Sequence, residues 1–362
     1  MLLDYLAFWA PFHIDALGII TLFGADEVDK AVGRLARNRY TAGLPLLGAF
    51  KIAGNSIVNP QPGFVLHNIS DQILATDVTG WFARWLLCQD LKFSSTTLSI
   101  LSIKQPQSGV WRQVGNFVLG ATAISPLLVA AILMEDRWGL ANVMAMLMSI
   151  VVRCIIVGQN HAAINNAAKK SRSTSNVLVK AIVTLPTGNA ITIKTTRGII
   201  IDCLLTAPRP PDPTFYSCVR AFGFVCYGGQ AIALGMATLV NQIMTVALML
   251  GSTALVVWQV GDNEEMIGSH LRIQRSDSAG PDFRAAAMAR LDLSTIEEDT
   301  LLAWNLFPQR SNKIWWEKYR TCQSMPQHLR PFWYWEKYLA VPTLPPVPSF
   351  DQTPDARNEA CA

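Results

Sequence analysis

Arg153 has the clearest chemical potential in this sequence. It lies about fourteen residues inside a stretch, Gly139–Gly158, that holds no other charged side chain. A guanidinium at membrane depth costs at least ~2.5–3.5 kcal/mol on insertion scales, so such residues usually serve a function. Arg153 could polarise a lipophilic substrate held between helices. The alternative is that its long side chain extends to the lipid headgroups, since the stretch ends nearby.

A second pair of candidates lies near the N-terminus, where His13 and Asp15 interrupt the apolar stretch Tyr5–Phe23. Desolvation raises the pKa of a carboxyl group, which would let Asp15 act as a general acid or base beside a neutral His13. The two residues do not share a helical face, because they are too close in sequence. Two alternatives remain open for the stretch: a fifth membrane span, or an interfacial or re-entrant helix whose polar groups contact water.

His67 and Asp71 form a third pair of candidates. Their spacing would place both side chains on one face if Val65–Trp85 is helical. Such a pair could transfer a proton or bind a metal ion. The alternative is an ordinary solvated helical face, on which this spacing is common.

Two groups of polar side chains could line a substrate pocket. Asn160 and His161 follow directly after the Gly139–Gly158 stretch, and Asn241 and Gln242 stand where the longest apolar run must turn. The first group could instead cap and solvate the end of a helix. The second could form hydrogen bonds between helices or lie at the membrane interface.

The elements that position these residues are predicted by the distribution of charge. The run Ala221–Gly261 has 41 residues without Asp, Glu, Lys or Arg, which is about 60 Å of helix and twice the thickness of a bilayer core. It therefore predicts two spans with a tight reversal near Gly235–Gln242. The four predicted spans form two helical hairpins: Val114–Met134, Gly139–Gly158, Tyr216–Met236 and Thr238–Val260.

The segment between the two hairpins carries seven Lys and Arg but only two Asp, which is typical of a cytosolic loop. Within it, two β-rich runs flank Pro186–Asn189 and predict a β-hairpin. Ile199–Leu205 could be a third strand or a short helix. Leu44–Val58 is apolar but short and holds Lys51, so we expect at most a partly buried helix there.

The last hundred residues predict a folded cytosolic tail. His270–Arg275 could be a strand, Phe283–Leu291 looks helical, and Ser294 with Glu297 predicts a capping box at the start of Ser294–Trp304. The fold class is therefore mainly α: multi-pass transmembrane helices with a small β-containing cytosolic connector and an α-rich cytosolic tail. The expected divisions are an N-terminal region (1–112), the first hairpin (113–158), the basic connector (159–215), the second hairpin (216–260), the tail (261–340) and a disordered C-terminus (341–362).

Several classes of function are disfavoured by missing motifs. The sequence has no P-loop, no dinucleotide fingerprint, no HExxH, no nucleophile elbow and no pair of Asp-rich diphosphate motifs. We therefore predict no cofactor and no metal. The Trp-rich patches of the tail fit docking to a membrane surface better than nucleic-acid binding. The seven cysteines are odd in number and contain no CxxC pair, which predicts reduced thiols.

Three segments carry a resemblance: Ile191–Thr206, Pro208–Pro213 and Trp304–Tyr319. Through them the chain resembles uncharacterised multi-pass integral membrane proteins of filamentous fungi, over most of its length. Some members of that group look like accessory proteins encoded beside specialised-metabolite genes. The resemblance implies an endomembrane location, most simply the endoplasmic reticulum, and polyketide or terpenoid chemistry. It supplies no active-site residues.

Two functions follow as hypotheses. The first is a membrane-embedded, cofactor-free cyclase or isomerase that acts on a lipophilic intermediate through Arg153, Asp15 and His13. The second is a non-enzymatic scaffold or accessory subunit that holds other biosynthetic enzymes at the membrane. A small transporter ranks last, because four or five spans are few for a secondary carrier.

Overall fold

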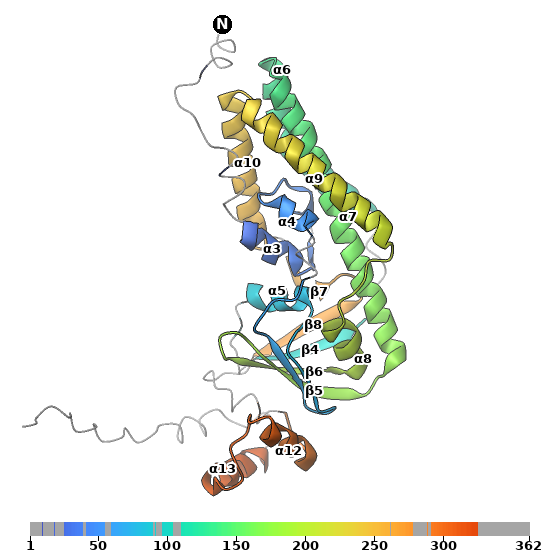
Figure 1. Cartoon of the computed structure of the whole chain (residues 1–362), viewed down its shortest axis with the longest axis vertical. Coiled ribbons are helices and arrows are strands. Elements are labelled where there is room, and N and C mark those ends of the chain that lie inside the picture. The colour runs from blue at the N-terminus through green and yellow to red at the C-terminus, as the bar shows by residue number, and fades with distance from the viewer. Residues whose placement is uncertain are drawn as a thin grey trace, which may run out of the picture.

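The computed structural model describes residues 25–38, 41–54, 59–89, 96–103, 110–260, 262–277 and 291–324, with a few single residues besides. Long helices stand on a β-sheet, and a small helical tail lies on the far side of that sheet (Figure 1). Residues Tyr5–Phe23 lie outside the described part, except for Trp9 and Gly18. The structure therefore describes neither His13 nor Asp15. Most of Phe283–Leu291 and all of 341–362 also lie outside the described part.

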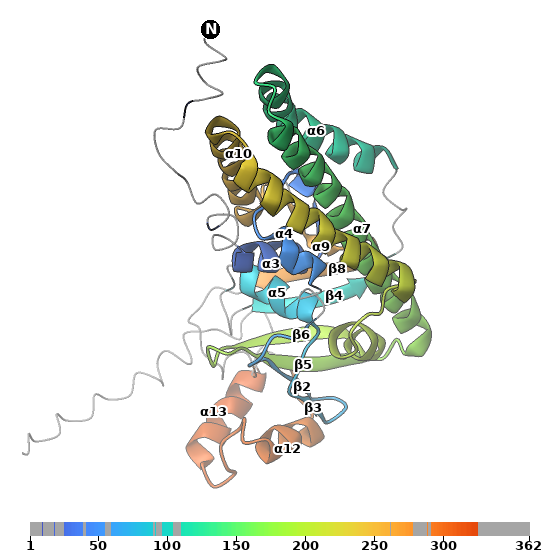
Figure 2. The same ribbon diagram turned by 45° about the horizontal axis from the view of Figure 1, so that its top comes forward.

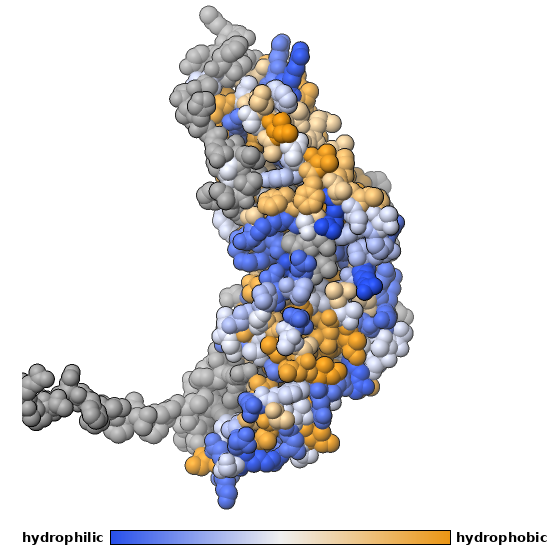
Figure 3. Space-filling model, in the orientation of Figure 1, coloured by the Kyte–Doolittle hydropathy of each residue, from blue (hydrophilic) through white to orange (hydrophobic). Residues whose placement is uncertain are grey.

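Four helices are long and apolar enough to cross a membrane, as predicted. They are α6 (Val110–Leu133), α7 (Arg137–Thr174), α9 (Pro213–Met236) and α10 (Leu239–Val257). At most 39% of the most apolar stretch of each helix is buried, and the space-filling view shows apolar surface in orange and tan over much of the upper half of the molecule, interrupted by polar side chains (Figure 3). An apolar surface on this scale indicates an integral membrane protein.

The arrangement of these helices differs from two separate hairpins. Helix α7 does not end at Gly158 but continues to Thr174, so the expected boundary at 158/159 falls inside one helix. The chain reverses between α9 and α10 at Ala237, within the predicted region. From there the two helices diverge, and α9 packs along α7 while α10 contacts α6 and α3 (Figure 1). Gly223 permits the close α7–α9 contact, since a Cβ there would lie 2.9 Å from Val152 Cγ1.

One eight-stranded sheet collects segments from all over the chain. Its described strands lie in the order β1-β7-β8-β4-β6-β5-β2-β3, and among them β4 and β6 form the one parallel pair. The predicted connector therefore supplies two of the eight strands rather than a β-structure of its own. The strands are β1 (Ala36–Asn38), β2 (Val65–Asn68), β3 (Ile73–Ala75), β4 (Thr96–Ser102), β5 (Leu178–Thr184), β6 (Ala190–Thr196), β7 (Asp262–Ile267) and β8 (Leu271–Asp277).

The local predictions within this sheet are confirmed. Strands β5 and β6 form the antiparallel hairpin expected around Pro186–Asn189, with Gly188 at a positive φ of 83° in the turn. Strand β8 matches the expected strand at His270–Arg275. Of the two alternatives for Ile199–Leu205, the structure has the helical one, a short α8 (Arg197–Ile199) that widens into a π-helical turn.

The main core lies between the sheet and the helices above it. Helix α5 (Gly80–Cys88) places Trp81, Phe82 and Trp85 against the inner face of the sheet. Helices α3 (Ala25–Gly33) and α4 (Ala49–Ala53) lie between this core and the four long helices (Figure 1). The short apolar segment Leu44–Val58 thus holds the expected small helix, α4.

Residues 291–324, which we call the tail from here on, cover the opposite face of the sheet. Helices α12 (Thr295–Ala303) and α13 (Lys313–Ser324) pack beneath β2 and β5 (Figure 2). Their apolar residues join Ile69, Ile182 and Ala190 of the sheet in one buried cluster. The predicted capping box is present, because Ser294 and Glu297 exchange side-chain and backbone hydrogen bonds.

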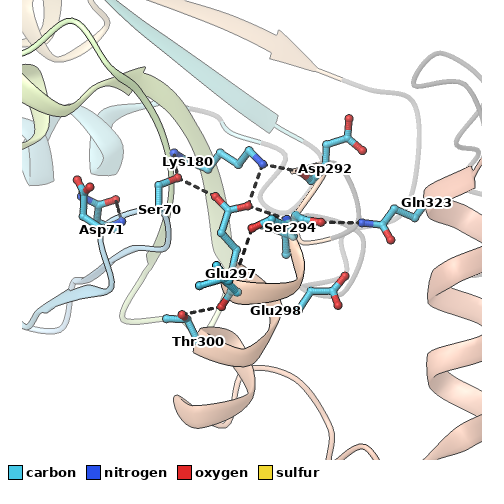
Figure 4. Close-up of polar contacts among 12 residues, drawn as sticks. Ser70, Asp71, Lys180, Asp292, Ser294, Glu297, Glu298, Thr300 and Gln323 are labelled. Carbon is cyan, nitrogen blue, oxygen red and sulfur yellow. Dashed lines mark hydrogen bonds and ion pairs between the residues drawn. The ribbon is translucent and has the colours of Figure 1, made fainter.

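Glu297 also fastens the tail to the sheet. Its carboxylate accepts hydrogen bonds from Lys180 Nζ at 3.0 Å and from Ser70 Oγ at 2.8 Å, besides the Ser294 amide at 2.8 Å (Figure 4). Burial would raise the pKa of Glu297, but the hydrogen bonds from Ser294, Lys180 and Ser70 outweigh burial and hold the pKa below its ordinary value. The carboxylate therefore stays ionised at neutral pH.

We expect docking of the tail to weaken in acid. A carboxyl group with a lowered pKa stabilises the folded state above its ordinary pKa of 4.5, and that contribution is lost as pH falls through the lowered value. Hydrogen exchange in peptides of α12, corrected for intrinsic rates, should rise between pH 5 and pH 3 while exchange in β6 changes less. Glu297→Gln should show faster α12 exchange at pH 7 and little further change in acid. An unchanged acid response in that variant would assign the effect to other groups.

Candidate functional site

Arg153 lies in the interior of the helical part and contacts backbone rather than solvent. Its side chain is 5% exposed, and Nη2 donates to the carbonyl oxygens of Ala42 at 2.7 Å and Leu44 at 2.5 Å. At 1.5 Å per residue it stands about 24 Å along α7 from Arg137, which is inside a ~30 Å hydrocarbon core. The guanidinium thus supplies hydrogen bonds to irregular backbone at membrane depth.

That backbone belongs to residues 41–54, which we call the inserted segment. It enters between the four long helices and places Leu47 in an apolar cluster formed by side chains of α6, α7, α9 and α10. The Leu47 amide donates to Thr253 Oγ1 of α10 at 3.1 Å. Non-helical backbone is tolerated at membrane depth only where protein groups satisfy it.

Arg220 holds the other end of the inserted segment. Its Nε donates to the Ala53 carbonyl oxygen at 2.7 Å, and its guanidinium lies 6.0 Å from the centre of the Tyr216 ring. Arg153 from α7, Arg220 from α9 and Thr253 from α10 therefore fix three points along the segment. The site is a clamp built from side chains that lie far apart in the sequence.

Helix α6, the remaining long helix, contacts the inserted segment at two glycines. A Cβ on Gly43 would lie 1.9 Å from the Asn116 carbonyl oxygen, and a Cβ on Gly120 would lie 2.0 Å from the Gly43 oxygen. Only residues without side chains allow the segment and α6 to approach so closely. Such direct backbone contact leaves no space for a ligand at this point.

Little room remains beside Arg153 for a substrate. The cavity that Arg153 lines, with Ser149, Ile156 and Tyr227 among its walls, measures about 10 Å³. That volume is at the lower limit for a single water molecule. In this conformation the lipophilic pocket expected around Arg153 is filled by the inserted segment.

The predicted pocket residues Asn160 and His161 lie lower on α7 and contact protein. Asn160 is buried and its Nδ2 donates to the Ile156 carbonyl at 2.9 Å and to Tyr216 Oη at 3.2 Å. His161 Nε2 lies 3.0 Å from the Leu35 carbonyl oxygen. These contacts join α7 to α9 and to the link between α3 and β1, so both residues connect elements of the fold.

Asn241 and Gln242 lie at the end of the long helices farthest from the sheet. There the chain turns from α6 into α7 and from α9 into α10. Asn241 Nδ2 donates to Asp136 Oδ2 at 2.6 Å, and the same oxygen accepts from the Thr238 amide at 2.8 Å. Gln242 donates to the Ala237 carbonyl. Of the alternatives given for this pair, hydrogen bonding between helices is the one that Asn241 shows. Neither residue lies near Arg153 or Asn160.

The prediction that His67 and Asp71 share one face of a helix is wrong, because neither residue is helical. His67 lies on β2 and Asp71 in the turn that follows, because β2 and β3 form a tight antiparallel pair. The His67 ring lies 5.4 Å from the Trp304 ring of the tail. Asp71 instead accepts two hydrogen bonds from Arg197, one of them from Nε at 3.0 Å. The two side chains therefore have different partners and make no acid–base pair with each other.

Two larger hollows are each lined in part by residues of α9. One, of about 440 Å³, is lined by two acids and two bases, Asp26, Asp29, Lys51 and Arg84, together with Phe50 and Phe224. Arg84 Nε donates to Asp29 at 3.0 Å, and Lys51 pairs with Asp26. The other, of about 460 Å³, lies between the 206–213 loop and the start of α9.

The chain matches no family model, no curated protein and no solved structure. The resemblance to fungal membrane proteins therefore stays a prediction, and conclusions about function depend on the geometry alone. That geometry separates the described site residues into four places: Arg153 in the clamp, Asn160 and His161 lower on α7, Asn241 and Gln242 at the far reversals, and His67 and Asp71 at the sheet.

Sequence reasoning missed the second half of the clamp. Arg220 immediately precedes the 41-residue charge-free run and lies about two turns inside α9, a signal that could have identified it. The glycines Gly43 and Gly120 gave no comparable signal, because nothing in a single sequence pairs them. The buried Arg84–Asp29 pair also had no local signature.

Proposed function

We propose that this protein is a membrane-anchored scaffold, a non-enzymatic accessory subunit whose sheet and tail hold soluble biosynthetic enzymes at a membrane surface. The observation that carries this proposal is the commitment of Arg153. The residue best placed for membrane-depth chemistry binds two backbone carbonyls in a space of about 10 Å³. It acts on the protein's own backbone.

One further reactive group, the Cys203 thiol, supports the same proposal. Cys203 is buried beneath α5, and burial, with the neighbouring Asp202 adding to it, raises the pKa of its thiol to about 12. A thiol with so high a pKa is a poor nucleophile at neutral pH. By contrast the sheet with its docked tail offers a large folded surface outside the apolar helices (Figure 3).

A second candidate function is the cofactor-free cyclase or isomerase, and the 440 Å³ hollow favours it. The hydrogen bond from Lys51 and its charge hold the pKa of Asp26 below its ordinary value, so this carboxylate is ionised at neutral pH and can stabilise positive charge that develops on a bound intermediate. Phe50 and Phe224 would contact the apolar part of a lipophilic intermediate. Polyketides and terpenoids are substrates of this kind.

Microsomes that contain the full chain alone, supplied with an uncyclised intermediate from neighbouring genes, separate the two functions. A scaffold leaves the intermediate unchanged until a partner enzyme is added. Formation of an isomer of equal mass by the chain alone would contradict the scaffold. In that event loss of the product in Asp26→Asn, but not in the exposed Glu265→Gln, would place catalysis in the hollow.

The sheet side is proposed to face the cytosol, with the helices in the endoplasmic reticulum membrane. Lys169, Lys170 and Arg172 at the end of α7 lie on this side, and an excess of such residues marks cytosolic loops. A protease-cleavable tag placed in the β5–β6 turn, at Thr187, should be cut in sealed right-side-out microsomes. A tag there that is protected until detergent is added would reverse the proposed orientation.

A further inference from the structure

The 460 Å³ hollow beside α9 is a basic groove, formed by Arg209 and Pro208 of the loop and by Tyr216, Ser217 and Arg220 of the helix. The loop rises from α8 to the lower end of α9 (Figure 1). Among the described residues no carboxylate lines this groove. The lining therefore presents two guanidinium groups and the hydroxyl groups of Thr206, Tyr216 and Ser217 without a compensating acid.

The two arginines of the groove differ in how firmly the protein holds their side chains. Arg220 is held in place by its Nε bond to Ala53 and by the Tyr216 ring, and its terminal nitrogens donate to nothing within the described part of the chain. Arg209 is exposed and forms no ion pair there. A guanidinium fixed through Nε still offers its terminal N–H groups, which match the oxygens of a phosphate.

The groove extends from the edge of the hydrocarbon core to the height of the lipid headgroups. Arg220 is about 24 Å along α9 from Met236, as Arg153 is along α7 from Arg137, whereas Arg209 precedes the sheet-side end of α9. Phe215 and Phe222 are exposed on this helix, 45% and 48%. They stand two turns apart on the face of α9 that points away from Arg220, where lipid chains can contact this end of the helix. The α9 N-terminus itself is already capped by Asp212, and the charge of the site comes from the arginines.

We infer that this groove binds the phosphate headgroup of an anionic membrane lipid, with the headgroup between Arg209 and Arg220 and the chains along α9. Basic pockets at the membrane surface between helices bind anionic headgroups by this chemistry. The site is independent of whether the protein is a scaffold or an enzyme, because it uses none of the residues assigned to either function.

The test measures thermal unfolding of the full chain in a neutral detergent with three additives: dioctanoyl phosphatidic acid, dioctanoyl phosphatidylcholine and inorganic phosphate. We expect the phosphatidic acid to raise Tm by about 3–6 °C at a concentration near a hundred times its Kd, and the other two additives to have little effect. Equal shifts with the two lipids would overturn the inference. An equal shift with inorganic phosphate would mean that the groove binds a free anion rather than a lipid.

Variants locate the effect. Arg209→Gln should weaken the apparent Kd for phosphatidic acid at least about tenfold, and Arg209→Glu should remove the shift, without lowering Tm in the absence of lipid. Arg137→Gln removes the same charge from an exposed arginine at the opposite end of the helices and should change neither. Undiminished binding by both Arg209 variants would overturn the assignment to this groove. Arg220 is not used as a test residue, because its loss would also release Ala53.

Discussion

Replacing Arg153 by alanine is expected to unfold the helical part rather than to inactivate an intact protein. The change leaves the Leu44 carbonyl without a donor at membrane depth, and the Ala42 carbonyl keeps only the weak thiol donor of Cys154 at 3.6 Å. A buried unsatisfied group costs about 1–3 kcal/mol, and the weakened bond to Ala42 adds to this loss, which is a large part of a typical total stability. Monodisperse protein recovered in mild detergent should fall severely, and Tm of the remainder should drop.

Arg153→Lys is the informative companion to that variant. An ammonium group has donors for both carbonyls, but it is shorter and cannot present them in the planar arrangement of a guanidinium. We expect intermediate stability from the lysine variant and no change from Arg137→Ala, which removes an exposed arginine from the same helix. A stable, well-folded Arg153→Ala protein that fails only in turnover would return Arg153 to a catalytic role and contradict the clamp.

Both sequence-based interpretations of Arg153 assumed that a buried arginine must face either a substrate or the headgroups. The structure shows a third use, in which it satisfies backbone of the inserted segment. The alternative that the side chain extends to the headgroups is wrong, because it is almost fully buried. The inserted segment was visible in sequence only as a short apolar stretch, since its position depends on four helices that come later in the chain.

Features with local physical causes could be predicted. The four apolar helices follow from hydropathy, the β5–β6 hairpin from the turn at Pro186–Asn189, and the capping box from Ser294 and Glu297. Each of these signals lies within one element or one turn. They indicate a mostly helical fold with four candidate membrane spans, but they do not say which elements meet.

The eight-stranded sheet could not be predicted for that reason. Strand β4 pairs with β8 and β6, which are separated from it by the helices α6 and α7. Such pairings depend on where the long helices return the chain and leave no periodic trace in either strand. The same limit applies to His67 and Asp71, whose spacing suited a helix although the residues around them form a tight β-turn.

Asp136→Ala is the second substitution from which we expect a large loss of stability. The Asp136 carboxylate accepts from the Gly139 amide at 2.8 Å, which caps α7, and from the Thr238 amide and Asn241 Nδ2 at the start of α10. It therefore joins the two helix reversals by one side chain. Asp136→Ala removes a helix cap worth about 0.5–2 kcal/mol and leaves a fully buried amide without its acceptor at about 1–3 kcal/mol more.

We expect Asp136→Ala to lower Tm strongly, and a double-mutant cycle shows how. Asn241→Ala alone should cost less, and the pair Asp136→Ala with Asn241→Ala should cost clearly less than the sum, because both changes break the same bond. The neighbouring Glu135→Asn removes an exposed carboxylate at a positive φ that asparagine tolerates, and it should alter stability by no more than about 0.5 kcal/mol. Strict additivity of the two changes would mean that the reversals are held together by packing alone.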